Sequence, residues 1–283
     1  LPVFKSGIFN NMTTGAPITI LFANNNTRST DYEKQRAVPR PGHADFVAGK
    51  KFGGFEDFRG GGHFSGRLTV ALVAAGVIAK KLLANPSFSS PSNEGTLSSI
   101  SIASQLLEVA GETIIEKGLQ KAIDAKDSGG GLVECRVAGL PVGLGEPFFD
   151  SMESVLSHAV FSIPAVRGIE FGTGFAAARM YGIEHNDAIE NTSGKTTTNH
   201  AGGIVGGITN GNEVVFRIAI KPTSSTPKLQ QTLNIESGEI EPFSVKGRHD
   251  LCIALRVPVV LEAVTAIVFA DLMLLEQRIP RLV

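Results

Sequence analysis

The chain has 283 residues, of which 42% are hydrophobic and 19% charged, and its formal net charge at pH 7 is -1. This composition is typical of a soluble globular protein with enough apolar residues for a large core. The balanced charge removes the electrostatic basis for general nucleic-acid binding, so any anion site has to be local.

Three segments alternate apolar and polar residues with a period of two, which predicts half-buried strands. They are PITILF (17–22), LVECRV (132–137) and EVVFRIAI (213–220). In LVECRV, Val133, Cys135 and Val137 alternate with Glu134 and Arg136. One face of the predicted sheet is therefore apolar and the other polar.

Helices are predicted over 67–84, 97–127, 147–163 and 258–279, with 85–99 as a surface loop between two of them. Strands and long helices interleave without the short βαβ cadence of a nucleotide-binding fold, and the GxGxxG fingerprint is absent. We therefore predict one α+β domain of packed layers spanning residues 1–283.

Membrane, export and metal functions find little support. The apolar stretches 68–79 and 257–275 are too short or are interrupted by charges, and the opening LPVFKSGIFN lacks a basic signal-peptide region. Cys135 and Cys252 form no CxxC pair and stand apart from other metal-type ligands. We expect both as buried, reduced thiols in a cytoplasmic protein without a metal site.

Glycine-rich loops carry the candidate chemistry. They are RPGHAD (40–45), DFRGGGHFSGR (57–67), NHAGGIVGG (199–207) and KPTSS (221–225). Such loops let the backbone approach a ligand closely and offer N–H groups to phosphate or carboxylate oxygens. Turn geometry is the better explanation of any one of these loops, but each also holds an Arg, Lys, His or hydroxyl side chain. The joint pattern favours an anion-binding site.

The positions of individual residues sharpen this interpretation. Arg67 precedes an apolar helix whose N-terminus favours an anion, and Lys221 directly follows a predicted strand. The turn Pro41–Gly42 fixes the direction of His43, which suits either proton transfer or a solvated loop histidine. The segment KGRHD (246–250) is either a polar turn or a corner that binds anions and handles protons.

Six motifs follow one another in a specific order: RPGHAD, DFRGGG-x-x-SGR, GLPVGLGEPFFD (139–150), NHAGGIVGG, KPTSS and KGRHD. In this order, and over nearly the whole chain, they resemble the chorismate synthase family. The resemblance implies a β-α-β sandwich, with long helices between antiparallel sheets, assembled as a homotetramer of two dimers. It also implies a cytoplasmic lyase of the shikimate pathway, which makes aromatic amino acids.

The implied reaction is the 1,4-anti elimination that converts 5-enolpyruvylshikimate 3-phosphate to chorismate and phosphate with reduced FMN. The resemblance assigns His43 as proton donor to the reduced flavin and Asp250 as the acid/base for the proton on flavin N5. It places Arg67 and Arg248 against the anionic groups of the substrate. It implies that FMN meets residues of several loops: His63, Phe64, Ser65, Pro164, Ala165, Gly206, Lys221, Pro222, Thr223, Ser224, Ser225 and Arg248.

The sequence departs from the family pattern in two places. His63 and Phe64 stand where the family motif reads Arg-Ser, and the chain begins after the family's N-terminal GESHG and RRPG motifs. The alternative is therefore a catalytically impaired flavin- or phosphate-binding protein on the same scaffold. NADPH-dependent reduction of its own flavin and reliance on cellular reductants are both compatible with the sequence.

Overall fold

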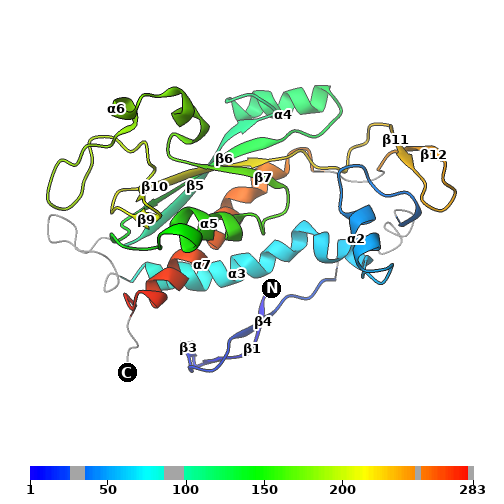
Figure 1. Cartoon of the computed structure of the whole chain (residues 1–283). Coiled ribbons are helices and arrows are strands. Elements are labelled where there is room, and N and C mark those ends of the chain that lie inside the picture. Colours follow the sequence, from blue (N-terminus) through cyan, green and yellow to red (C-terminus); the bar gives the residue numbers. More distant parts are fainter. Residues whose placement is uncertain (26–35, 86–98, 246–249, 280–283) are drawn as a thin grey trace. The chain divides into compact units, whose positions relative to one another are not determined.

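The computed structural model describes residues 1–25, 36–85, 99–245 and 250–279. They form two compact units, each with its own elements (Figure 1). The smaller unit contains Leu1–Ser65 and Gln231–Glu241, and the larger contains Gly66–Gln230 and Pro242–Val283. Residues 86–98 of the predicted surface loop lie outside the described residues.

A four-stranded antiparallel sheet forms one layer of the larger unit. Its strands, in spatial order, are β5 (Ser101–Val109), β6 (Gly131–Ala138), β10 (Val214–Ile220) and β7 (Val166–Phe171). The predicted strands at 132–137 and 213–220 are confirmed, and Cys135 lies opposite Phe216 in their register. Both side chains are fully buried, as period-two alternation requires.

Helices α5 (Met152–Val160) and α7 (Val257–Leu275) pack on the sheet, α5 against β7 and α7 against β5 and β6. Helix α3 (Thr69–Leu83) packs against α7 (Figure 1). The predicted helix at 67–84 is confirmed, except that Gly66–Leu68 form a separate 3-10 turn, η2. At the crossing of α3 and α7, a Cβ on Gly76 would overlap the backbone of Ala263, so glycine sets this close approach.

The stretch Ile253–Leu275 is long and apolar enough to cross a membrane by composition alone. However, 67% of its most apolar window is buried inside the structure, as in the core helix of a soluble protein. Pro258 lies in the first turn of α7, where its missing N–H costs no helical hydrogen bond. The helix therefore serves as the hydrophobic core of the larger unit.

The helix predicted over 97–127 is wrong for its first half. Residues Ser101–Val109 form strand β5, and only Ile115–Asp124 form a helix, α4. Ile100, Ile102 and Leu106 follow the strand period of two, and left-handed residues at Ala110 and Gly111 turn the chain before α4 begins. The four-residue spacing of Ile115, Leu119 and Ile123 belongs to α4 alone.

Shorter elements complete the larger unit. The 3-10 turn η4 (Phe148–Asp150) precedes α5, so the helix predicted over 147–163 begins later than expected, at Met152. The connection from β7 to β10 holds η5 (Gly174–Arg179), α6 (Gly182–His185), and the paired strands β8 (Ile204–Val205) and β9 (Ile208–Thr209). The turn η6 (Ile253–Arg256) leads into α7.

The smaller unit is built from short elements. β1 (Val3–Ser6) pairs with β4 (Thr19–Leu21), which confirms the strand predicted at 17–22, and β2 (Ile8–Phe9) pairs with β3 (Met12–Thr13). The helix α2 (Asp45–Lys51) and the 3-10 helix η1 (Arg59–Phe64) follow. The hairpin of β11 (Gln230–Leu233) and β12 (Ile240–Phe243) has most of its residues here. Helices and antiparallel sheets thus mix as predicted, and the α+β class is confirmed.

The polar face of the sheet holds a buried carboxylate. Glu134 is only 3% exposed, although its strand pattern predicts a position on the polar face. Its carboxylate accepts hydrogen bonds from Arg136 and Arg217, at 2.7 and 2.8 Å, and lies 3.3 Å from the Gln105 amide. Long side chains from three neighbouring strands cover it, so a polar face need not be an exposed one.

These contacts make the stability of the protein depend on pH. Burial opposes ionisation of Glu134, but hydrogen bonds and charges from Arg136, Gln105 and Arg217 outweigh it and lower its pKa from the ordinary 4.5. A carboxyl whose pKa is lowered by folding stabilises the protein at higher pH, and that stabilisation disappears as the pH falls through the lowered value.

We expect Glu134→Gln to lower the free energy of unfolding at pH 7 and to flatten its decline below about pH 4.5, measured by urea denaturation across pH. Glu213→Gln is the matched control, because Glu213 pairs with the same Arg136 but its side chain is 37% exposed. A surface pair contributes little, so the control should change stability by less than about 1 kcal/mol. Equal effects of the two substitutions would contradict the role given to burial.

Candidate active site

A tight turn presents His43 in the smaller unit. The His43 N–H donates to the carbonyl of Arg40 at 3.2 Å, and Gly42 between them has a φ of 70°, which glycine adopts without strain. Helix α2 begins two residues later, with Asp45 in its first turn and Lys50 and Lys51 in its last. Charges so placed stabilise the helix dipole at both ends, and they fix Asp45 beside the turn.

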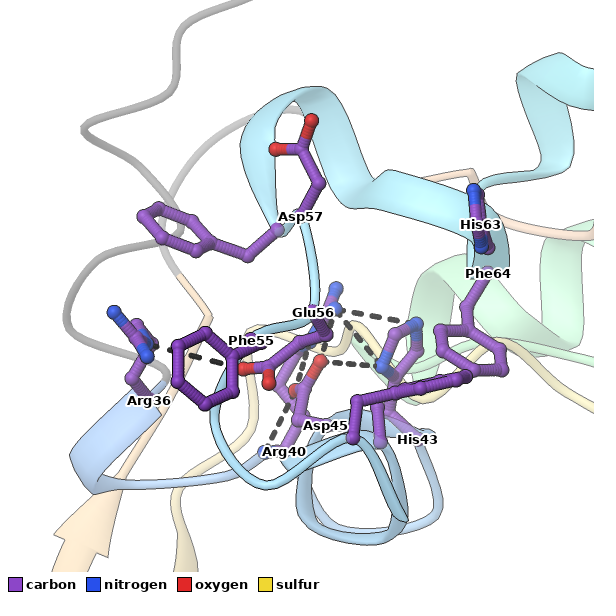
Figure 2. A pocket seen from close by; sticks show the side chains of 12 residues that line it. Arg36, Arg40, His43, Asp45, Phe55, Glu56, Asp57, His63 and Phe64 are labelled. Atoms are coloured by element: carbon purple, nitrogen blue, oxygen red, sulfur yellow. Dashed lines mark hydrogen bonds and ion pairs between the residues drawn. The ribbon is translucent and has the colours of Figure 1, made fainter. Parts of the chain in front are cut away.

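Three side chains of the RPGHAD motif bond to one another (Figure 2). Arg40 donates to the Asp45 carboxylate through Nε at 2.7 Å and through Nη2 at 2.8 Å. His43 Nδ1 lies 2.6 Å from Asp45 Oδ1. Burial opposes ionisation of Asp45, but hydrogen bonds and charges from Arg40 and His43 outweigh it and hold the pKa of Asp45 well below its ordinary value. The carboxylate therefore stays ionised.

The cluster lines a cavity of about 250 Å³ that also receives His63 and Phe64 from η1 (Figure 2). Three of the predicted site residues thus share one cavity. Its other walls are largely aromatic, from Phe52, Phe55 and Phe58. An aromatic wall beside two imidazoles suits a flat ring with polar edges.

Most charges that line this cavity are already paired. Arg36 lies 3.8 Å from Glu56 and stacks on Phe58, while Arg40 is neutralised by Asp45. Glu56 Oε2 is buried and has no hydrogen-bond partner within the described chain, so it can accept a bond from a ligand. The cavity therefore lacks the excess of positive charge that a strong anion-binding site needs.

The glycine run before His63 has a conformational cause. Gly62 has a φ of 56°, and a Cβ there would overlap the carbonyl of Asp57. Only glycine allows η1 to close on this carbonyl and to place His63 and Phe64 at the cavity. Ser65 follows at the end of η1. It does not cap α3, because the N-cap of that helix is Leu68.

The predicted residues of the larger unit gather where strand β10 ends. The Lys221 N–H donates to the carbonyl of Ala165 at 3.0 Å, which joins the KPTSS loop to the Pro164–Ala165 turn. The register between β10 and β7 shifts at Ala219 and Ile220, and such a bulge redirects the side chains that follow. Ala165 has a φ of 73°, a strained conformation for a residue with a Cβ.

A second turn packs against the KPTSS loop. Ser128 Oγ donates to the carbonyl of Thr223 at 2.8 Å, and a Cβ on Gly130 would press on Ile220 and Pro222. The Gly129 N–H donates to the carbonyl of Leu251 at 2.9 Å, so the chain next to Asp250 reaches the same corner. The segments 164–165, 221–225 and 250–251 are thus adjacent, although they are far apart in sequence.

Lys221 is the partly buried cation of this corner. Burial, with a smaller contribution from the nearby charge of Arg167, lowers the pKa of Lys221. Asp250 forms an ion pair with Arg256 at 2.7 Å, and its side chain is 42% exposed. An amine that lies in a partly desolvated position is ready to bind an anion there.

Not every predicted residue joins this corner. Gly206 lies in the turn between β8 and β9, beside the start of β10, whereas Lys221 follows the end of that strand. A seven-residue strand separates its ends by roughly 20 Å. Arg67 lies in η2, before α3, and is exposed. Arg248 lies outside the described residues.

Sequence reasoning missed Arg40 and Asp45 as site residues, although both belong to a motif that it singled out. Their role depends on side-chain contacts that the spacing in RPGHAD does not reveal. The available signal was the presence of a cation and a carboxylate, Arg40 and Asp45, on either side of His43 in the sequence. The buried positions of Cys135 and Cys252 are confirmed, and burial raises the pKa of the Cys135 thiol to about 11.

Comparison with known proteins identifies the family. A sequence model described as chorismate synthase matches residues 2–274. The chorismate synthase of Chitinophaga pinensis is 72% identical over 278 residues, which are 98% of this chain and 80% of that protein. This chain belongs to the chorismate synthase family. The resemblance inferred from six ordered motifs is confirmed.

More distant relatives agree with this family assignment. The chorismate synthase of Dehalococcoides mccartyi is 44% identical, over 98% of this chain and 81% of that protein. A solved crystal structure of chorismate synthase superposes with a TM-score of 0.69, covering 97% of this chain and 78% of that chain at 24% identity. At this identity the likeness supports the fold, and the α+β architecture is that of the chorismate synthase family.

If the Lys221–Ser225 loop contacts FMN, as the family resemblance implies, Lys221→Met should weaken FMN binding at least tenfold, measured by fluorescence titration. The substitution removes a partly desolvated charge, so the free energy of unfolding should stay equal or rise. Lys228→Met is the control, because Lys228 is half exposed and pairs with Asp127. Unchanged FMN affinity in Lys221→Met would remove this loop from the flavin site.

Proposed function

We propose that this chain converts 5-enolpyruvylshikimate 3-phosphate to chorismate and phosphate by 1,4-anti elimination, with reduced FMN as its cofactor. Membership of the chorismate synthase family makes it an enzyme, a carbon–oxygen lyase of the shikimate pathway with a small-molecule substrate and a flavin. The observation that supports the proposal most is that a carboxylate holds the His43 ring in place at a cavity. His43 shares a cavity with His63 and Phe64, and an ionised carboxylate bonds to its Nδ1.

The corner at the end of β10 fits the phosphate of a flavin nucleotide. It offers the ammonium of Lys221 and the hydroxyls of Thr223, Ser224 and Ser225, next to the strained Ala165 turn. A phosphate needs several such donors, and the turn gives them a fixed backbone. We assign Pro164, Ala165 and the Lys221–Ser225 loop, including Pro222, to this role. His63, Phe64, Ser65, Gly206 and Arg248 complete the proposed flavin-binding set.

Reduced FMN would supply the electron density that assists loss of the phosphate group from the substrate. The protein then has to bind anions, exclude water and hold protons at fixed atoms. Arg67 and Arg248 are proposed to bind the phosphate and carboxylates of the substrate, since preorganised cations stabilise a charged leaving group without rearranging. His43 would donate a proton from its ring, and Asp250 would accept one at its carboxylate.

The Asp250 carboxylate pairs with Arg256 in this structure. Arg256 is 76% exposed, so a bound ligand can displace it at small cost. This geometry is compatible with the acid/base role that the resemblance gives to Asp250.

The second candidate is an impaired flavin- or phosphate-binding protein. Its support is His63-Phe64 in place of the Arg-Ser of the family motif, since this exchange removes a cation from the cavity. Against it stands the 72% identity to a chorismate synthase. We further propose that the protein is cytoplasmic, that residues 1–283 act as one domain, and that four copies assemble as a dimer of dimers.

Purified protein given reduced FMN and 5-enolpyruvylshikimate 3-phosphate under anaerobic conditions should release one phosphate per chorismate formed. Phosphate is measured colorimetrically and chorismate by its absorbance, and oxidised FMN serves as the control. FMN binding without phosphate release would contradict the lyase and favour the binding protein. This experiment separates the two candidates directly.

Asp250→Asn should retain FMN affinity within about twofold and reduce turnover by roughly a hundredfold or more, because the amide cannot accept the proton. Stopped-flow measurement of phosphate release gives the turnover, and flavin fluorescence gives the affinity. Asp124→Asn, on the exposed surface of α4, is the charge-matched control. Turnover equal to the wild type would exclude Asp250 as the acid/base.

A further inference from the structure

We infer that Asp45 is a positioning residue, which acts with Arg40 to fix the tautomer and orientation of the His43 ring. The inference rests on the proposed function, in which His43 gives up a proton, and adds a residue to that machinery. Asp45 is not itself proposed to touch the substrate. Its role is exerted through His43.

The first argument is geometric. Both oxygens of Asp45 are engaged: Oδ2 accepts from Arg40 Nε at 2.7 Å and from the Arg40 N–H at 3.1 Å, and Oδ1 accepts from Nη2 at 2.8 Å. His43 Nδ1 is 2.6 Å from the same Oδ1. The side chains are largely buried, with exposures of 9% for Arg40, 17% for Asp45 and 21% for His43. Arg40 thus fixes the position of the Asp45 carboxylate, which in turn bonds to the imidazole of His43.

The second argument concerns the proton. An ionised carboxylate can only accept a hydrogen bond, so Nδ1 of His43 must carry a hydrogen. Arg40 Nη2 lies 2.9 Å from Nδ1 and 3.1 Å from Nε2, so it lies against both ring nitrogens and does not select between them. The carboxylate therefore decides the tautomer of the neutral ring, which carries its hydrogen on Nδ1 and leaves the lone pair on Nε2. Any proton that His43 takes up and later releases moves at Nε2.

The third argument concerns charge. Arg40 places a positive charge against the ring, and the Asp45 carboxylate neutralises that charge through a short ion pair. Other ionisable groups face His43 across the cavity: Arg36, Glu56, Asp57 and His63. Arg36 is close to Glu56, and Asp57 bonds to Arg59 at 2.7 Å, so neither carboxylate can replace Asp45 beside the ring.

Asparagine is the informative substitution at this position. Its amide has the size of the carboxylate, but an NH₂ group replaces one of the two oxygens. A guanidinium can only donate, so the amide oxygen faces Arg40 and the N–H faces the ring. Nδ1 must then become the acceptor, and the hydrogen moves to Nε2. Asp45→Asn should therefore reverse the tautomer while leaving the cavity walls in place.

The test is ¹⁵N NMR of the full chain with labelled histidine and without flavin, using His43→Gln to assign the His43 signals. The wild type should show His43 protonated at Nδ1, and Asp45→Asn should shift most of the population to Nε2–H. In the assay with reduced FMN, Asp45→Asn should reduce kcat about a hundredfold with KM changed less than threefold.

Asp45→Glu keeps the charge and should restore the Nδ1–H tautomer and part of kcat. Asp124→Asn should leave the tautomer and kcat unchanged. A wild-type His43 protonated only at Nε2 would overturn the inference without any variant, even if Asp45→Asn fails to fold. An unchanged tautomer in folded Asp45→Asn would overturn it as well. A wild type that shows the expected tautomer but releases no phosphate would contradict the proposed function and leave the positioning role standing.

Discussion

The larger unit depends on the burial of helix α7, whose side chains are apolar around most of its circumference. It packs against α3 at Gly76, against α5, and against β5 and β6 of the sheet. Glu262 is the main polar exception. It pairs with Lys80 on α3 and accepts the N–H of Ser104 on the edge strand β5 at 2.9 Å. This one helix thereby orders both layers, and the loops at the ends of the strands hold their positions because it is rigid.

The candidate chemistry of the larger unit lies in loops that this scaffold fixes. At the end of β10 the backbone of Lys221 bonds to Ala165, and Ser128 bonds to Thr223. Each contact joins segments that the sequence separates by tens of residues. A phosphate bound here would meet donors that are already ordered, so little entropy is lost on binding. The strained φ of Ala165 is compatible with a turn shaped for a ligand rather than for stability.

Buried carboxylates clamped by arginine occur in both units, with different consequences. Glu134 holds Arg136 and Arg217 on the polar face of the sheet, and none of these three residues lines the cavity at His43. That cluster serves stability. Asp45 holds Arg40 in the same manner, but a histidine and a cavity lie beside it. The surroundings, and not the type of pair, decide which of these carboxylates can orient a histidine at a cavity.

The sequence by itself determined the strands 132–137 and 213–220, the helices that became α3 and α7, and membership of the family. These depend on local periodicity and on the order of motifs, and both can be read from the sequence without a structure. Tertiary structure decided the rest. Ser101–Val109 is a strand because it pairs with β6 at the edge of the sheet. Glu134 is buried because side chains from neighbouring strands cover it. Tertiary structure also joined Asp45 to His43, since a hydrogen bond depends on distance and angle in space, which spacing along the chain does not fix.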